Sequence, residues 1–231
     1  MNLHLLVEGR RTEMRVYPRW LAHLLPHHSR VDFPDAVARN NYFLFSGEGY
    51  PRLLDVTLPN AIADVNASGK YQYLIVCLDA DEDSVEDRRD GAARHAAESK
   101  PSLDPGVTLK VIVQNRSMET WFLGNRRVFP RHSLGARFRE MAAFHDTSIL
   151  DPEAMGKPDD YATHADFHHD YLREMLAVRG LRYAKTSPGL VADPSYLDAL
   201  IERTRDEPAH LATFQSFLAL CGNIRDLSKP A

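Results

Sequence analysis

The sequence has little cysteine, no long hydrophobic run and no excess of positive charge. Only Cys77 and Cys221 occur among 231 residues, too few for the disulfide framework of a small secreted domain. No apolar run approaches the ~20 residues that span a bilayer, and the apolar stretch Leu3–Val7 is too short for a signal-peptide core. The sequence therefore predicts a cytoplasmic, reduced protein with no membrane partner.

Charge and missing motifs exclude further classes. The 28 Lys and Arg against 32 Asp and Glu give a net charge of −4, whereas a protein that coats nucleic-acid duplexes is usually strongly basic. Any nucleic acid must therefore bind a local patch. The glycine-rich P-loop of ATPases and the G-x-S-x-G elbow of serine hydrolases are both absent from the sequence. The chain itself is not expected to hydrolyse ATP.

The composition that is present, 44% hydrophobic and 26% charged residues, is typical of a folded globular protein. Up to about residue 130, apolar strand patterns alternate with helical patterns, which is typical of an α/β sheet with right-handed crossovers. Beyond that point only helical patterns recur, starting with residues 134–144. We predict a mostly parallel, Rossmann-like sheet flanked by helices over residues 1–130 and a helical C-terminal region over residues 131–231 packed on it. The expected strands are Leu3–Val7, 42–45, 73–78 and 107–113.

Acidic residues stand where these strands should end. Glu8 follows the first strand, Asp79 and Asp81 follow the most apolar one, and Glu119 lies just beyond the last. Because binding sites of open parallel sheets form outside the carboxyl ends of the strands, these side chains are expected to converge. Carboxylates that converge without a cation would repel one another. Oxygen ligands suit Mg²⁺ or Mn²⁺, so the pattern predicts one or two such ions. The structural alternative is a polar turn for the Asp pair and an ordinary helix N-terminal acid for Glu119.

Three of these acidic residues lie in two segments that resemble the signature motifs of the Toprim domain, which topoisomerases, DnaG-type primases and nucleases of the OLD family share. The segment L-V-E-G at residues 6–9, with Thr-Glu at 12–13, is similar to the first motif, and L-D-A-D at residues 78–81 is similar to the second. The resemblance implies a Toprim-like fold in which the metal ligands are Glu8, Asp79 and Asp81. The acidic run continues to Asp83, so either Asp81 or Asp83 is the second aspartate ligand.

The segment N-R-S-M-E-T-W-F-L at residues 115–123 is similar to a motif of RloB-type Toprim proteins, small bacterial proteins commonly encoded beside ABC- or SMC-like ATPases in defence loci. Tyr183-Ala184-Lys185 with Gly189, Pro208 and Phe214 resembles the tail of one such family. The resemblance implies a metal-dependent nuclease that acts with an ATPase partner in antiviral defence. The expected partner is nucleic acid, with DNA favoured over RNA, although the choice between them stays open. Topoisomerase and primase functions are disfavoured because their additional modules are missing. Assembly into homo-oligomers stays open.

This interpretation assigns a role to each candidate residue. The metal, held by Glu8, Asp79 and either Asp81 or Asp83, would activate a water molecule. Lys185 would neutralise the charge that develops on the phosphoryl group, and Glu119 would be a further ligand or would orient one. The expected catalytic residues are Glu8, Asp79, Asp81, Glu119 and Lys185. The expected phosphate-binding residues are Arg10, Arg11, Arg116, Arg126 and Arg127. For each of these cations the alternative is a solvated surface side chain.

Two other functions also fit the sequence. The first is a non-catalytic Toprim-like module that binds a partner ATPase, a nucleotide or a nucleic-acid end. The second is a phosphohydrolase or phosphotransferase with a strand-end aspartate as nucleophile, which leaves Glu8 and Glu119 unexplained. His164, His168 and His169 have a spacing that can hold zinc, but the glutamate of a His-Glu-x-x-His motif is missing, and we expect surface histidines here.

Overall fold

The centre of the computed structural model, which describes residues 1–132 and 135–229, is a five-stranded parallel sheet. The order of the strands is β2-β3-β1-β4-β5. This confirms the predicted α/β class. The sequence did not indicate β2, because its three residues are largely exposed and form no apolar run. The strands are β1 (Leu3–Val7), β2 (Ser29–Val31), β3 (Asn41–Ser46), β4 (Tyr73–Asp79) and β5 (Thr108–Gln114).

The first strand occupies the middle of the sheet. Val7 pairs with Ser46 of β3 on one side and with Cys77 of β4 on the other. All five residues of β1 are buried, as are the five central residues of β4. Continuous burial is expected where helices cover both faces of a parallel sheet.

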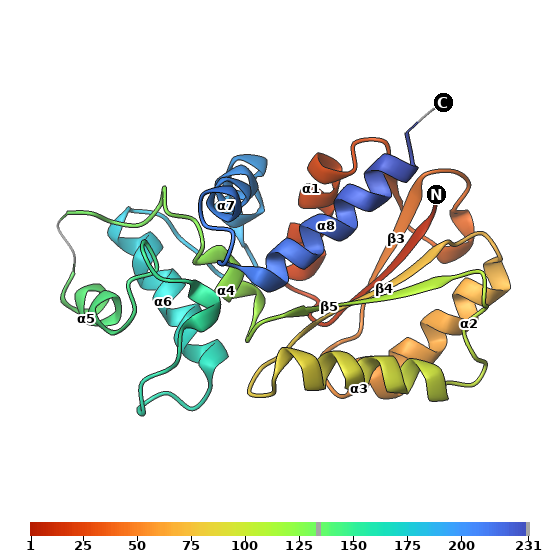
Figure 1. Ribbon diagram of the computed structural model, residues 1–231, viewed down its shortest axis with the longest axis horizontal. Coiled ribbons are helices and arrows are strands. Elements are labelled where there is room, and N and C mark those ends of the chain that lie inside the picture. Colours follow the sequence, from red (N-terminus) through yellow and green to blue (C-terminus); the bar gives the residue numbers. More distant parts are fainter. Residues whose placement is uncertain (133–134, 230–231) are drawn as a thin grey trace. The chain divides into compact units, whose positions relative to one another are not determined.

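Helices lie on both faces of this sheet (Figure 1). On one face are α1 (Glu13–Leu24) and the C-terminal part of α8 (Ala212–Leu227), and on the other are α2 (Leu58–Ser68) and α3 (Val85–Glu98). Tyr17 of α1 packs edge-to-face against Phe217 of α8, with ring centroids 5.5 Å apart.

Proline and glycine set the limits of α2. A π-helical turn over Leu53–Thr57 precedes the helix, and Pro59 occupies its first turn, where no backbone donor is required. Gly69 ends the helix with a φ of 61°, a left-handed conformation that glycine adopts without steric cost. A 3₁₀ turn, η1 (Pro34–Ala36), packs against α2.

The chain divides into two compact units. The first comprises residues 1–78, 85–113 and 216–231, and the second comprises residues 79–84 and 114–215. The predicted helix over residues 134–144 corresponds to α5, and Leu134 lies outside the described residues. None of the helices in the described ranges is long and apolar enough to cross a membrane. The second unit contains α4 (Met118–Phe122), α5 (Ala136–Phe144), α6 (His164–Val178) and α7 (Pro194–Asp206).

Both cysteines are buried free thiols. Cys77 lies in β4 and Cys221 in α8. Burial raises the pKa of the Cys77 thiol to about 12, and it also raises that of Cys221. Because the thiolate is the reactive form, neither buried thiol is suited to act as a nucleophile.

Candidate functional site

Glu8 lies directly after β1 in the first unit. Its backbone N–H donates to the carbonyl of Cys77 at 3.0 Å, which extends the ladder between β1 and β4 by one residue. The next residue, Gly9, donates its N–H to Oε1 of Glu13 at 2.8 Å. A Cβ atom at residue 9 would collide with the Glu13 carboxylate. The strand therefore ends in a Glu-Gly turn, and a side chain at the second position would require the Glu13 carboxylate to move.

The acidic loop, residues 79–84, begins with the last residue of β4 and belongs to the second unit. The backbone N–H of Asp81 donates to the carbonyl of Arg116 at 2.9 Å. The Arg116 guanidinium donates in return to the carbonyls of Asp81 and Asp83, at 3.0 and 3.4 Å. The structure therefore places Arg116, an expected phosphate ligand, against the backbone of the acidic loop.

Backbone strain marks the same pair of residues. Asp81 has a φ of 51° and Arg116 a φ of 65°. Aspartate visits this left-handed region more readily than most residues, whereas an arginine there is uncommon. Such conformations persist only where surrounding contacts enforce them, and they concentrate at functional sites. The reciprocal bonds between Asp81 and Arg116 are contacts of this kind.

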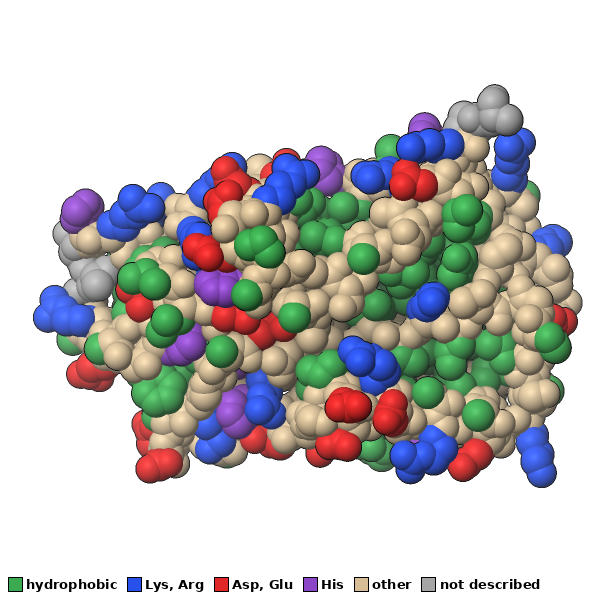
Figure 2. All heavy atoms as spheres, viewed as in Figure 1, with side chains coloured by type: hydrophobic (Ala, Val, Ile, Leu, Met, Phe, Trp, Pro, Cys, Tyr) green, Lys and Arg blue, Asp and Glu red, His purple; other side chains and the backbone are tan. Residues whose placement is uncertain are grey.

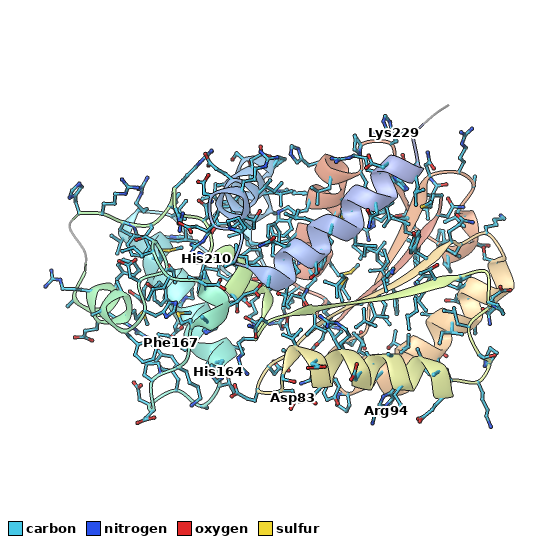
Figure 3. All side chains as sticks on the ribbon, in the orientation of Figure 1. Asp83, Arg94, His164, Phe167, His210 and Lys229 are labelled. Atoms are coloured by element: carbon cyan, nitrogen blue, oxygen red, sulfur yellow. The ribbon has the colours of Figure 1, made fainter. Side chains whose placement is uncertain are left out.

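Glu82 connects the acidic loop to the first turn of α6 through contacts with His164. Its Oε1 accepts the backbone N–H of His164 at 2.7 Å, and its Oε2 lies 2.7 Å from Nδ1 of the same residue. Partial burial acts to raise the pKa of Glu82, but the two hydrogen bonds from His164 outweigh it and the pKa is lowered. Figure 3 shows His164 and Phe167 projecting from this end of α6. Sequence reasoning missed Glu82 because nothing in the acidic run distinguishes it from its neighbours.

A second cluster forms around Glu119 of α4. The hydroxyl of Tyr183 donates to Glu119 Oε1 at 2.7 Å. The Lys185 ammonium lies 3.7 Å from the same oxygen, and the Glu119 side chain is only 4% exposed. The structure thus brings together two of the predicted catalytic residues, Glu119 and Lys185, and adds Tyr183 between them.

His169 borders this cluster. Its ring lies 5.8 Å from that of Tyr183 between centroids. Burial lowers the pKa of His169; the charge of Glu119 acts against this shift, and that of Lys185 adds to it. The Glu119 cluster, defined here as Glu119, His169, Tyr183 and Lys185, therefore combines a buried acid with a half-exposed cation.

A groove of about 500 Å³ runs beside the Glu119 cluster in the second unit. Its lining includes Arg173, Arg182 and Tyr183. The loop that follows Tyr183 is closed by a bridge between Ala184 and Ser187. Two arginines and a tyrosine in this lining can contact a phosphate backbone, and the acidic Glu174 lines the groove beside them.

The remaining arginines expected to bind phosphate lie at the surface, where three have acidic neighbours. Arg10 is 3.6 Å from Glu48, and Arg126 is 3.3 Å from Glu207. Arg127 is 2.6 Å from Glu202, and Arg11 is exposed. Figure 2 shows basic and acidic side chains interspersed on the visible face. The side chains of Arg10 and Arg127 are 68% and 59% exposed, and exposed ion pairs are weak.

The expectation of surface histidines is wrong for His168. This residue is fully buried. Its Nδ1 lies 2.8 Å from the Thr120 hydroxyl and its Nε2 lies 3.2 Å from the carbonyl of Met155. Burial lowers the pKa of His168 to about 4, so the ring is neutral. It is a core residue on the inner face of α6, which spacing alone did not reveal.

The predicted metal ligands fit a hard divalent cation by donor type. Glu8, Asp79, Asp81 and Asp83 offer only carboxylate oxygens, which Mg²⁺ and Mn²⁺ prefer. In the two described ranges, no group of three or more His, Cys, Asp or Glu side chains is gathered closely enough to hold a metal ion. The metal therefore stays a prediction that rests on donor chemistry and on position in the fold.

Comparison with known proteins assigns no family. No family model, no curated protein and no solved structure matches this chain. The features that bear on function are therefore the acidic loop, the Glu119 cluster and the strand ends.

Proposed function

We propose that this chain is a Mg²⁺- or Mn²⁺-dependent nuclease of the Toprim type, which hydrolyses phosphodiester bonds of nucleic acid. The observation that carries the proposal is the position of two acids on neighbouring strands. Glu8 follows β1 and Asp79 closes β4, and these strands pair in parallel. Parallel sheets form their sites outside these strand ends.

The cation would be held by Glu8, Asp79 and Asp81, with Asp83 as the alternative to Asp81. When bound, it would supply Lewis acidity and lower the pKa of a water molecule that attacks the phosphodiester. Arg116 holds the backbone carbonyls of Asp81 and Asp83. The loop that carries these ligands is therefore preorganised by the chain itself, which reduces the ordering that cation binding requires.

In this proposal Lys185 binds the phosphate and Glu119 positions it. The Lys185 side chain is 49% exposed, so its ammonium can reach a phosphate oxygen in solvent. Glu119 is buried and already accepts the Tyr183 hydroxyl, which suits an orienting residue better than a metal ligand. A cation held ready where negative charge develops stabilises the transition state.

The groove lined by Arg173, Arg182 and Tyr183 would hold the backbone of the substrate strand. The partnership with an ATPase in antiviral defence rests on the resemblance of residues 115–123 to RloB-type proteins, and the proposal favours DNA over RNA as the substrate. The sequence has no P-loop, so an ATP-driven step would be the partner's.

A calorimetric titration with Mn²⁺ tests the metal site without a partner protein. The wild type should bind Mn²⁺, and Asp79→Asn should bind at least about tenfold more weakly because a ligand charge is lost. Asp90→Asn is the matched control, since Asp90 is an exposed aspartate on α3. Absence of binding in the wild type and in Asp90→Asn would contradict the proposal and leave the non-catalytic module as the better function.

Cleavage of a labelled single strand in Mn²⁺ tests the assignment of Lys185. Lys185→Met should abolish cleavage and leave Mn²⁺ affinity unchanged, because Lys185 contacts the phosphate and not the metal. Full cleavage by this variant would remove Lys185 from the mechanism.

A further inference from the structure

A small cavity of about 230 Å³ in the first unit is lined in part by α2. Figure 1 shows α2 on one face of the sheet. Its lining is mostly apolar and comes from β1, β3, η1 and α2. Cavities for drug-sized ligands run to ~300–1,000 Å³, so this one suits a single planar ring system. The lining residues include His4, Pro34, Phe43, Phe45, Asn60 and Asp64.

The buried, unpaired ring of His4 indicates that this cavity binds a ligand. Its side chain is 1% exposed, and neither ring nitrogen has a hydrogen-bond partner among the described residues. Burial lowers the pKa of His4 to about 4, so the ring is neutral at physiological pH. A neutral imidazole has one donor and one acceptor nitrogen. Buried polar groups are normally paired, and His4 lines the cavity with both unpaired.

Aromatic rings surround His4 and hold its plane. It packs edge-to-face against Phe43 and Tyr71, with centroid distances of 5.2 and 5.4 Å. Phe43 is stacked with Phe45, their planes 15° apart, and Phe45 is 47% exposed. The cavity therefore presents a flat aromatic face that opens to solvent at Phe45. Such faces stack on planar heterocycles, including nucleobases.

The rim of the cavity is polar. Asn60 and Asp64 lie one helical turn apart on α2 and both line the opening. Desolvation raises the pKa of the Asp64 carboxyl. An amide and a carboxylate side by side match the alternating donors and acceptors on the edge of a nucleobase.

The part of the cavity wall that η1 forms is held in place. The hydroxyl of Tyr71 donates to the carbonyl of Pro34 at 2.5 Å. This hydrogen bond holds η1 in place beside the sheet that contains His4. A site whose walls are set before binding requires little ordering when the ligand arrives.

We propose that this cavity binds a nucleobase, with its ring against Phe43 and Phe45, an inner nitrogen bonded to His4, and its outer edge at Asn60 and Asp64. The base would be a free base or nucleoside, or an unpaired base of the nucleic-acid strand. This site lies within the first unit and does not depend on the proposed metal site.

Nuclear magnetic resonance of the full chain with ¹⁵N-labelled histidine gives a direct test. Titration with adenosine should be saturable and should shift the His4 ring nitrogens, while His132, which is exposed, should not move. His4→Phe should weaken binding at least about tenfold because the inner hydrogen bond is lost, and His132→Phe should not. No shift at His4 in the wild type, or full affinity in His4→Phe, would overturn the proposal.

Further variants and a second ligand complete the experiment. If His4→Phe does not fold, Phe45→Ser and Asn60→Ala replace it, since both residues are exposed, and unchanged affinity in both would refute the site. An oligonucleotide of deoxyadenosine that binds at least about tenfold more tightly than adenosine assigns the base to a strand, and equal affinity assigns it to the free nucleoside. Asp79→Asn should bind adenosine as the wild type does, so this result is separate from the metal titration.

Discussion

Arg203 is a buried cation that binds backbone carbonyls. Its side chain is 1% exposed. The guanidinium donates to the carbonyls of Gly124, Thr147 and Leu150, at 3.2, 2.6 and 2.6 Å. Desolvation lowers the pKa of Arg203 to about 10, so it stays charged at neutral pH. One side chain thus joins α7 to two other segments of the second unit, at Gly124 and at residues 147–150.

Replacement of this residue should destabilise the second unit strongly. Arg203→Met is expected to lower the free energy of unfolding by about 3 kcal/mol, because three buried carbonyls lose their donors. Arg203→Lys should recover only part of this loss, since an ammonium lacks the planar fork. Urea denaturation measures both variants, with Arg205→Met, exposed on the same helix, as control. Equal stability of Arg203→Met and the control would contradict this account.

At the level of elements, the loop after α6 is anchored through a single buried acid. Glu119 lies on the five-residue helix α4 and accepts the Tyr183 hydroxyl from this loop. Removal of the hydroxyl should free the segment that carries Lys185 without disturbing the sheet.

Tyr183→Phe should therefore raise the rate of amide hydrogen exchange in residues 182–189 about tenfold. A hydrogen bond to a charged acceptor contributes roughly 1.5–3 kcal/mol, enough to control local opening of a loop. Mass spectrometry measures the exchange, and the amides of β1 should not change. Tyr73→Phe is the control in the first unit, and protection of the loop equal to that of the wild type would show that other contacts hold it.

The elements themselves were largely predictable. The limits of β1 agree with its predicted run, and β4 is longer than its own predicted run by one residue, Asp79. This agreement is expected because continuous apolar segments between polar residues leave little choice of register. The edge strand β2 and the π-helical turn before α2 were not predicted. Their formation depends on pairing and packing with other segments, which local pattern does not report.

At the scale of the whole molecule, α8 contributes to both compact units. Phe214 packs edge-to-face against Trp121 in the second unit, with ring centroids 5.4 Å apart. Phe217, less than one helical turn later, packs against Tyr17 in the first. The two phenylalanines are both buried, so replacing each in turn tests whether the two units unfold independently.

Phe214→Ala and Phe217→Ala should each cost about 3–5 kcal/mol, but in different units. Trp20 reports on the first unit and Trp121 on the second, so urea unfolding is followed in Trp121→Phe and Trp20→Phe backgrounds. Phe217→Ala should lower the midpoint seen by Trp20, and Phe214→Ala that seen by Trp121. Identical shifts of both signals in both variants would show that the two units unfold as one.

Some features of the fold and of the candidate site follow from local sequence pattern, and others depend on the tertiary structure. By itself the sequence determined the α/β class, the ends of the central strands and the acids that follow them, because hydrophobic runs and turn residues act over short distances. Only the tertiary structure decided that Glu119 meets Tyr183 and Lys185, that Glu82 binds His164, and that His4 is enclosed. These contacts join segments far apart in the chain, and both burial and hydrogen bonding depend on which segments meet.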